Sequence, residues 1–336
     1  MNPPLYRGQC VKFDEQYSVA EIKAWNGSDW VWMPVPIVGK RVRHKVPENK
    51  VQSPTLLIKG SRAYLAVPFE SFVKLPSQKK VRRVCAVDLG INTTATASIV
   101  TQDGTVVARQ FFHLAADIDR RDRGLAQIRH KARQTMGCAG KLSEGFCKGA
   151  YRKAANRNRD MANRLSGKII AFAKAHAVEA VVFEHMKHFR PKGGKKRSTL
   201  RQRFHGWLHR KLAKKVNECA DEIGLRTEFV NPAGTSKYAY DGSGEVKRDK
   251  DNRALATFAN GKRYNADLNA SYNIGARFFA RVLGLSAGNG KAGASGKCTR
   301  ANQPRVPVTL STLWLHAQSG HAWEGKEAAT TALLSV

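Results

Sequence analysis

The fold is decided by one stretch of the sequence, residues 84–113, which reads VCAVDLGINTTATASIVTQDGTVVARQFFH. It begins with the apolar run Val84–Val87 and continues with the β-branched run 93–100. A Gly-containing turn, Gln102–Thr105, then leads into a third run that ends at His113. Apolar and β-branched runs bounded by turn residues predict strands, and short turns make neighbouring strands antiparallel. The stretch therefore predicts a three-stranded antiparallel meander.

Helices and two further strands are expected after the meander. The segment 115–177 has the pattern of a long helical hairpin, and residues 179–183 (EAVVF) have that of a buried strand. An amphipathic helix is expected over 199–223, a strand over 225–230 and a last helix over 266–283. This order predicts a mixed sheet in which the first and fourth strands are parallel neighbours. The fold class is therefore α/β, a mixed sheet with flanking helices.

Two regions of different character flank this α/β segment. Residues 1–80 contain the runs WVWMPVPIV and PTLLIKGSRAYLAVPF, separated by polar and basic turns, which predict a small β-barrel or sandwich. Residues 284–336 begin with GLSAGNGKAGASGK, a composition that predicts a flexible linker and C-terminal tail. The predicted domains are 1–80, 81–283 and 284–336.

The charge balance restricts the possible partners. The chain has 58 Lys and Arg against 26 Asp and Glu, a formal net charge of +32. Such an excess favours a polyanionic partner, either nucleic acid or an anionic membrane surface. The longest apolar stretch, 169–183, contains Lys174, His176 and Glu179, and is too short to span a bilayer. We therefore expect nucleic acid rather than a membrane as the partner.

The cysteines and the start of the chain indicate the compartment. The chain has six cysteines, and no two of them form a CxxC pair, so the spacing predicts neither a disulfide framework nor a zinc site. The first residues lack the charged-then-apolar pattern of a secretory signal. These features together predict a cytoplasmic protein with reduced thiols.

Basic residues concentrate in two segments. Residues 120–168 carry fourteen Lys or Arg against three acids, and residues 190–215 carry eleven with no acid. We interpret both as surfaces that contact nucleic-acid phosphates. The predicted contacts in the second segment are Arg190, Lys192, Lys195, Lys196, Arg197, Arg201, Arg203, Arg210 and Lys211.

Three acids stand at the ends of predicted elements. Asp88 ends the first strand, Glu184 ends the fourth, and Asp267 begins the last helix. Each acid alone fits ordinary turn or cap chemistry. Together they are expected to cluster, and clustered acids seldom persist without a cation such as Mg²⁺ or Mn²⁺. Two such ions can activate a water and stabilise a leaving oxygen, which predicts a metal-dependent nuclease with these three acids as catalytic and metal-binding residues.

The sequences around these acids resemble three motifs of the TnpB (OrfB) family of insertion-sequence proteins. They read AVDLGINTTATASIV at Asp88, AVVFEHMK at Glu184 and YNADLNASYNIGAR at Asp267. The family consists of RNA-guided nucleases with a RuvC-like, RNase H-type domain, related to compact type V CRISPR effectors. The resemblance covers residues 80–283 and implies an RNase H-like (RuvC) sheet, a guide RNA and a target DNA as partners, and a role linked to transposition. It also implies that the three acids form the catalytic triad.

The sequence departs from the family pattern in the insertion before the third motif. Family members usually carry two CxxC pairs there as a zinc ribbon, whereas residues 232–262 contain no cysteine. We therefore expect no structural zinc. The insertion is expected to be held by aromatic residues instead, namely Tyr238, Tyr240, Phe258 and Tyr264.

A second departure lies before the nuclease motifs. Family members place a helical recognition lobe within a β-barrel there, but only 87 residues precede Asp88. The resemblance therefore implies that 1–80 is a truncated oligonucleotide-binding (WED-like) region. Three accessory residues are also predicted. Lys247 and Arg248 lie on the insertion that borders the active site in relatives and would steady transition-state charge, and Asn269 would orient Asp267.

The main hypothesis is a transposon-associated RNA-guided DNA endonuclease that uses two metal ions. Two alternatives stay open. The first is a truncated or non-cleaving RNA-guided DNA-binding protein, which would have no need of three converging acids. The second is an unguided, structure-specific RuvC-like nuclease, which would cut branched DNA without RNA.

Overall fold

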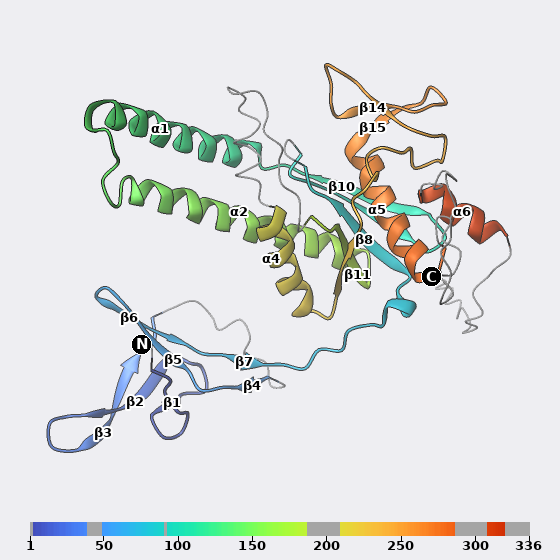
Figure 1. The fold of residues 1–336 in the computed structure, drawn as a ribbon. Helices are drawn as coiled ribbons and strands as arrows, with labels where there is room; N and C mark the ends of the chain where they lie inside the picture. The colour runs from blue at the N-terminus through green and yellow to red at the C-terminus, as the bar shows by residue number, and fades with distance from the viewer. Residues whose placement is uncertain (1–2, 39–48, 91–92, 187–208, 286–307, 320–336) are drawn as a thin grey trace, which may run out of the picture. The chain divides into compact units, whose positions relative to one another are not determined.

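The chain folds into two compact units, residues 1–74 and 75–336. The computed structural model describes residues 3–38, 49–90, 93–186, 209–285 and 308–319, and Figure 1 shows its elements in chain order. The first unit consists of strands, and the second combines a sheet with helices. The division after residue 74 lies close to the expected end of the β-rich region at residue 80.

The first unit is β-rich, as the aromatic and β-branched runs predict. Its described strands pair in three separate small sheets, so the barrel-like assembly stays a prediction. The β5–β6 hairpin turns at Gly60, whose φ of 62° favours glycine. The strands are β1 (Val11–Phe13), β2 (Val19–Trp25), β3 (Trp30–Pro36), β4 (Lys50–Val51), β5 (Thr55–Lys59), β6 (Arg62–Ala66) and β7 (Phe69–Glu70).

A five-stranded mixed sheet forms the centre of the second unit. Its order is β10-β9-β8-β11-β12, with β8, β9 and β10 antiparallel and β8, β11 and β12 parallel. This confirms both the meander and the parallel pairing of the first and fourth strands. The strands are β8 (Arg83–Asp88), β9 (Ala95–Thr101), β10 (Val106–Phe112), β11 (Ala180–Glu184) and β12 (Arg226–Val230).

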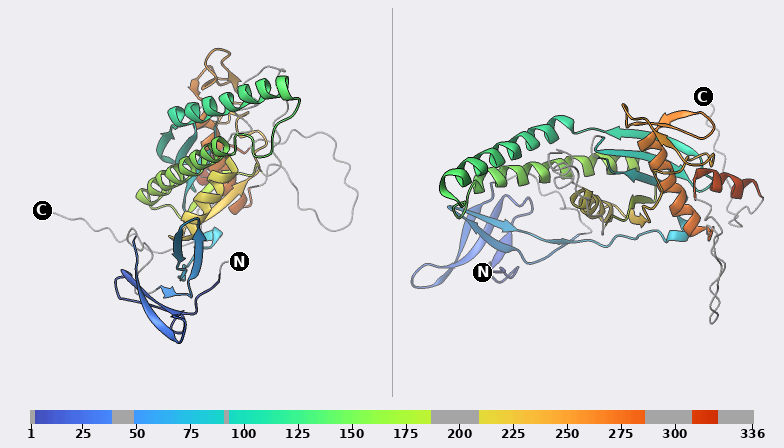
Figure 2. Two further views of the ribbon diagram at one scale, coloured as in Figure 1. Left: turned by 90° about the vertical axis from the view of Figure 1, so that its left-hand side faces the viewer. Right: turned by 45° about the horizontal axis from the view of Figure 1, so that its top comes forward.

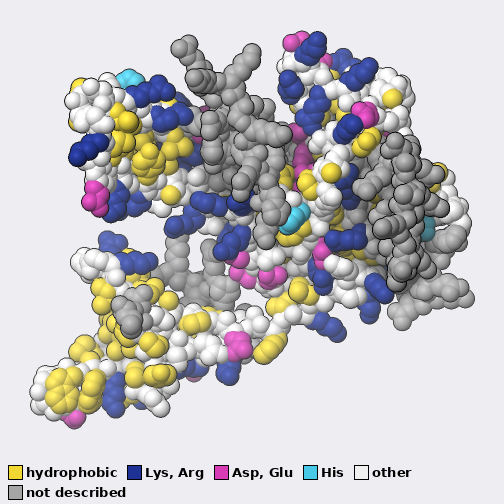
Figure 3. All heavy atoms as spheres, viewed as in Figure 1, with side chains coloured by type: hydrophobic (Ala, Val, Ile, Leu, Met, Phe, Trp, Pro, Cys, Tyr) yellow, Lys and Arg dark blue, Asp and Glu magenta, His cyan; other side chains and the backbone are white. Residues whose placement is uncertain are grey.

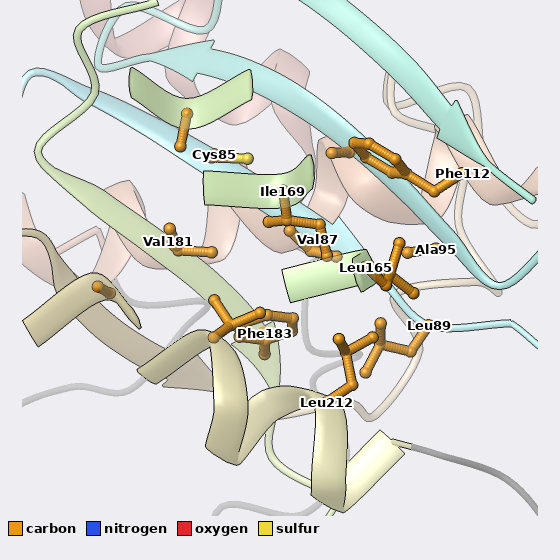
Figure 4. Packing of buried hydrophobic residues seen from close by; sticks show 14 of the residues in the cluster. Cys85, Val87, Leu89, Ala95, Phe112, Leu165, Ile169, Val181, Phe183 and Leu212 are labelled. Carbon is orange, nitrogen blue, oxygen red and sulfur yellow. The ribbon is translucent and has the colours of Figure 1, made fainter. Parts of the chain in front are cut away.

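Helices cover both faces of this sheet, so the second unit has three layers (Figure 1, Figure 2). Successive side chains of β8 alternate between two cores, because strand residues point alternately to opposite faces. Cys85 and Val87 pack with α2 and α4 (Figure 4), whereas Val84 and Ala86 pack with α5 and α6. The helices are α1 (Ala115–Ala139), α2 (Lys148–Ala175), α4 (His209–Asp221), α5 (Ala266–Val282) and α6 (Leu310–Gln318).

The predicted C-terminal tail contains a helix, α6, that the composition of 284–336 did not indicate. Helix α6 begins with a capping box at Thr309 and buries Leu310 and Leu313 in the core beside α5. Trp314 donates its indole N–H to the carbonyl oxygen of Gly104, at 2.7 Å. The Gly, Ala and Ser residues at the start of the segment indicate a linker. The helix after them is stabilised by these contacts with distant residues, which composition does not reveal. Residues 286–307 and 320–336 lie outside the described residues.

The insertion 232–262 and the residues after it form a small antiparallel sheet over the start of α5. The sheet comprises β13 (Lys247–Arg248), β14 (Leu255–Thr257) and β15 (Arg263–Asn265). The ring of Tyr240 lies 5.6 Å from Phe258, 5.2 Å from Tyr264 and 6.2 Å from Trp314, measured between centroids. Three of the four aromatic residues expected to hold the insertion, Tyr240, Phe258 and Tyr264, therefore pack against one another. Tyr238 contributes its carbonyl oxygen, which accepts hydrogen bonds from Asn269 and Asn273.

The close approach of α5 to the sheet gives a first testable prediction. A Cβ atom on Gly275 would lie 2.8 Å from Cγ2 of Val100 and 3.3 Å from Cβ of Ala86. We expect Gly275→Ala to lower the free energy of unfolding by about 1–3 kcal/mol, because overpacking displaces α5. The matched control is Gly167→Ala in α2, where no atom lies within 4 Å, and it should stabilise by about 0.5–1 kcal/mol. Urea unfolding measures both, and similar effects at the two sites would contradict the close packing.

The aromatic cluster of the insertion gives a second prediction. With Mg²⁺ kept in excess, a zinc-selective chelator should leave the thermal unfolding temperature unchanged if ring packing holds the insertion, as the lack of cysteine in 232–262 predicts. Tyr240→Ala should instead destabilise the protein by about 3 kcal/mol, as expected for loss of a large packed ring. Differential scanning calorimetry with and without chelator checks both. A fall in unfolding temperature on chelation, with zinc found by elemental analysis, would contradict this account.

Candidate active site

The parallel pairing of β8 and β11 places two of the predicted acids side by side. Val87 pairs with Phe183 across the two strands, and Asp88 and Glu184 are the next residues on each. Ala86 and Val182, two residues earlier, belong to the core beneath α5. Because residues two apart in a strand share a face, both carboxylates project toward the side that α5 covers.

The third acid, Asp267, lies in the first turn of α5. Asn265 caps this helix, and its side-chain oxygen accepts hydrogen bonds from the backbone N–H groups of Asp267 and Leu268, at 3.0 and 2.9 Å. The cap fixes where the helix starts and so where Asp267 stands. Asp267 lies close enough to Asp88 to raise the pKa of that carboxyl. The structure therefore brings together the three acids that are remote in sequence.

The electrostatics of the cluster follow from burial and like charge. Burial raises the pKa of Asp88 well above its usual value, and the neighbouring carboxylates of Glu184 and Asp267 raise it further. The guanidinium of Arg248 and the backbone N–H of Leu89 oppose this shift of the pKa. A buried group of acids destabilises the folded chain when all are ionised, so a cation among them would be stabilising.

The donor chemistry of the three acids fits a hard divalent cation. Carboxylate oxygens without nitrogen or sulfur ligands suit Mg²⁺ or Mn²⁺. Within the described residues, however, no three His, Cys, Asp or Glu side chains are already grouped so that they could hold one ion. The acids are thus close enough to repel one another without forming a preformed coordination shell.

Two residues that the sequence analysis missed contact Glu184 or act on it. Burial raises the pKa of Glu184, while a hydrogen bond from the buried hydroxyl of Thr235 and the positive charge of Arg277 lower it. Arg277 also donates to the carbonyl oxygen of Asn231, at 2.6 Å. Thr235 follows β12 at the same sheet edge, so the strand-end rule could have found it. Arg277 lies on α5 among apolar residues, and no local pattern singles it out.

The predicted accessory residues have different outcomes. Arg248 lies near Asp88, since its charge lowers the pKa of that carboxyl. Lys247 precedes it on β13, so its side chain points to the other face of that strand. Asn269 is fully buried and accepts a hydrogen bond from the backbone N–H of Tyr240, at 2.8 Å. Together with the bond to Tyr238 described above, this ties Asn269 to the insertion, and its role in orienting Asp267 stays a prediction.

Two of the nine phosphate contacts predicted in 190–215 fall within the described residues. Arg210 and Lys211 lie at the start of α4 and are exposed. Figure 3 shows further Lys and Arg side chains along the α1–α2 hairpin and around the insertion. None of the described helices is long and apolar enough to cross a bilayer. The remaining predicted contacts, Arg190, Lys192, Lys195, Lys196, Arg197, Arg201 and Arg203, lie outside the described residues.

Comparison with known proteins defines the class of fold. No family model matches the chain. The crystal structure of Alicyclobacillus acidoterrestris C2c1 in complex with single-guide RNA matches with a TM-score of 0.52 and 11% identity, covering 80% of this chain and 54% of that one. A mini-RNA-guided endonuclease, CRISPR-Cas_phi3, matches with a TM-score of 0.48 and 16% identity, covering 79% and 57%. The chain thus spans about half the length of these solved proteins, and it shares an α/β fold with C2c1.

A relative found by sequence comparison shows which family the chain resembles. The chain is 28% identical over 295 residues to a TnpB-like protein of Aquifex aeolicus (strain VF5), covering 84% of this chain and 90% of that protein. The resemblance to the TnpB family, first drawn from the motifs around the three acids, is confirmed.

The acid cluster gives a third prediction, on stability against pH. The folded pKa of Asp88 is raised above 3.8, so its contribution to stability is full below that pH and is lost as the pH rises through the folded pKa. In chelator at neutral pH, Asp88→Asn should therefore stabilise the chain, because it removes a buried charge that burial and the neighbouring acids disfavour. Chemical unfolding between pH 5 and 8 measures this. Asp160→Asn on α2, whose acid is 63% exposed and pairs with Arg164, is the control and should change stability by less than about 1 kcal/mol. Equal stability of Asp88→Asn and the parent at neutral pH would contradict the burial of this charge.

Proposed function

We propose that the chain is a transposon-associated RNA-guided DNA endonuclease that hydrolyses phosphodiester bonds. The observation that carries this proposal is the gathering of Asp88, Glu184 and Asp267 at one sheet edge. The confirmed TnpB resemblance supports it. As part of the same proposal, the mixed sheet is an RNase H-like (RuvC) nuclease domain. The first unit is then a partial oligonucleotide-binding (WED-like) region.

In this proposal each residue around the acids has a defined task. Asp88, Glu184 and Asp267 hold two Mg²⁺ or Mn²⁺ ions, which when bound would stabilise charge on the attacking and leaving oxygens of a phosphodiester. Thr235 holds one oxygen of Glu184 in place through its hydroxyl donation. Arg248 offsets part of the negative charge beside Asp88. These residues would orient the acids and keep them ionised.

The proposed partners are a guide RNA and a target DNA. The net charge of +32 supports binding of polyanions, and such binding weakens steeply with salt. In guided effectors the protein contacts the backbone of the heteroduplex while base pairing reads the sequence. The solved C2c1 relative in fold is itself in complex with a single-guide RNA. The cytoplasm, where thiols stay reduced and nucleic acid is accessible, is the proposed compartment.

The second candidate function is a non-cleaving RNA-guided DNA-binding protein. The net charge of +32 would support its binding of guide RNA and target DNA equally well. Such a protein would bind guide-matched DNA without cutting it. The two candidates therefore differ in cleavage and not in binding.

The fourth prediction tests this proposal directly. The full chain is produced together with the flanking transposon-end RNA, and cleavage of guide-matched DNA is measured with Mg²⁺ present. We expect cleavage that Asp88→Ala reduces by at least about 100-fold while leaving RNA binding unchanged, because this acid acts on the reaction and not on the guide. The control is Asp160→Ala, which changes an exposed acid on α2. This variant should cleave DNA as the parent does.

Each result separates the candidates. Guide-dependent binding without cleavage would favour the second candidate. Cutting of branched DNA in the absence of RNA would favour an unguided nuclease and overturn the guided one. Unimpaired cleavage by Asp88→Ala would remove the assigned role of the acid cluster.

A further inference from the structure

A pocket of about 470 Å³ opens beside Glu184, on the α4 side of the sheet. Its apolar lining includes Leu89, Met186 and Phe229, and its polar lining includes Arg210 and Lys214. The volume falls within the range of small-ligand sites, about 300–1,000 Å³. The pocket therefore has room for one nucleotide next to the acid cluster.

Helical periodicity explains why basic residues line this pocket. Leu212, Val216 and Ala220 repeat every four residues on α4 and are buried against the sheet and α2. Arg210 and Lys214 repeat on the neighbouring face, which is turned toward the pocket. The same helix thus packs with one face and presents two cations with the other.

Phe229 provides a flat apolar surface inside the pocket. It pairs in register with Phe183, and the two rings lie 6.2 Å apart between centroids. The ring of His185 meets Phe229 edge-on, at 6.1 Å and 78°. Phe229 nevertheless remains 38% exposed, because β12 is the edge strand of the sheet. A ring held from the side but open to solvent is suited to stacking.

We propose that this pocket binds one unpaired base of a single-stranded nucleic acid, with the base stacked on Phe229 and the adjoining phosphates against Arg210 and Lys214. Aromatic stacking combined with cations along the backbone is how sequence-tolerant single-strand sites work. Arg210 and Lys214 outnumber the one carboxylate in the lining, Glu184, and favour this occupant over an apolar peptide side chain. Glu184 marks the pocket's boundary with the acid cluster. Resting on the proposed function, the bound base belongs to a nucleotide beside the one whose phosphodiester is cut.

The test measures binding without any cleavage. The full chain is mixed, in chelator, with single-stranded DNA of about 12 nucleotides, within the size range of such sites, that carries 2-aminopurine at one position at a time. We expect the fluorescence to be quenched on binding in the parent. Phe229→Ala should remove the quenching and weaken binding by about 5- to 150-fold, the effect of losing one stacked base. Phe229→Tyr should restore both.

The matched control is Phe111→Ala on β10, at the opposite edge of the same sheet. Phe111 is 37% exposed, nearly the same as Phe229, and should leave quenching and affinity unchanged. Lys214→Gln should lower the slope of log affinity against log salt by about 1, as for the loss of one phosphate contact. Should Phe229→Ala fail to fold by circular dichroism, Phe229→Leu replaces it, because it keeps apolar volume without a stacking face.

The outcomes separate this inference from the proposed function. Quenching that depends on Phe229 supports the pocket even if the chain never cleaves DNA. Absence of quenching at every position, or equal effects of the Phe229 and Phe111 variants, would overturn the pocket while leaving Mg²⁺-dependent cleavage untouched. Displacement of the DNA by an apolar peptide but not by mononucleotide would assign the pocket to the peptide instead and overturn the inference.

Discussion

The register of β8 against β11 is the constraint on which the candidate site depends. Because Val87 faces Phe183, the residues that follow them reach the same sheet edge and the same face. A slip of one residue would send one carboxylate to the opposite core, since strand residues alternate between faces. Two differently shaped buried cores, one on each face, oppose that slip, because the apolar residues of the slipped strand would exchange the core in which they pack.

Helix α5 joins the acid cluster to the insertion. Asp267 lies in its first turn, and two and six residues further on Asn269 and Asn273 donate to the backbone of the loop after β12. Asn273 holds the carbonyl oxygen of Thr235, whose hydroxyl in turn contacts Glu184. The helix that supplies one acid therefore also positions the residue that orients another. The close approach at Gly275 keeps this helix against the sheet.

Charge acts at two scales in this chain. A net charge of +32 attracts polyanions from a distance, while the three acids make one small region negative. The two faces of the sheet carry different side chains. The acids face α5, whereas the pocket lined by Arg210, Lys214 and Phe229 lies on the side of α4. A nucleic-acid strand crossing the sheet edge would meet cations and a stacking surface on one side and carboxylates on the other.

The sequence by itself determined the meander, the parallel fourth strand, the α/β class and the three acids at the ends of elements. Strand alternation, turn residues and strand ends are local features, so residues such as Asp88 and Glu184 could be found from short segments. Only the tertiary structure decided the roles of Thr235, Arg277 and Asn269, the helix within the tail and the pocket beside Phe229. Each of these arises from contacts between segments far apart in the chain, and the partner in such a contact leaves no periodic signal in the residues around it.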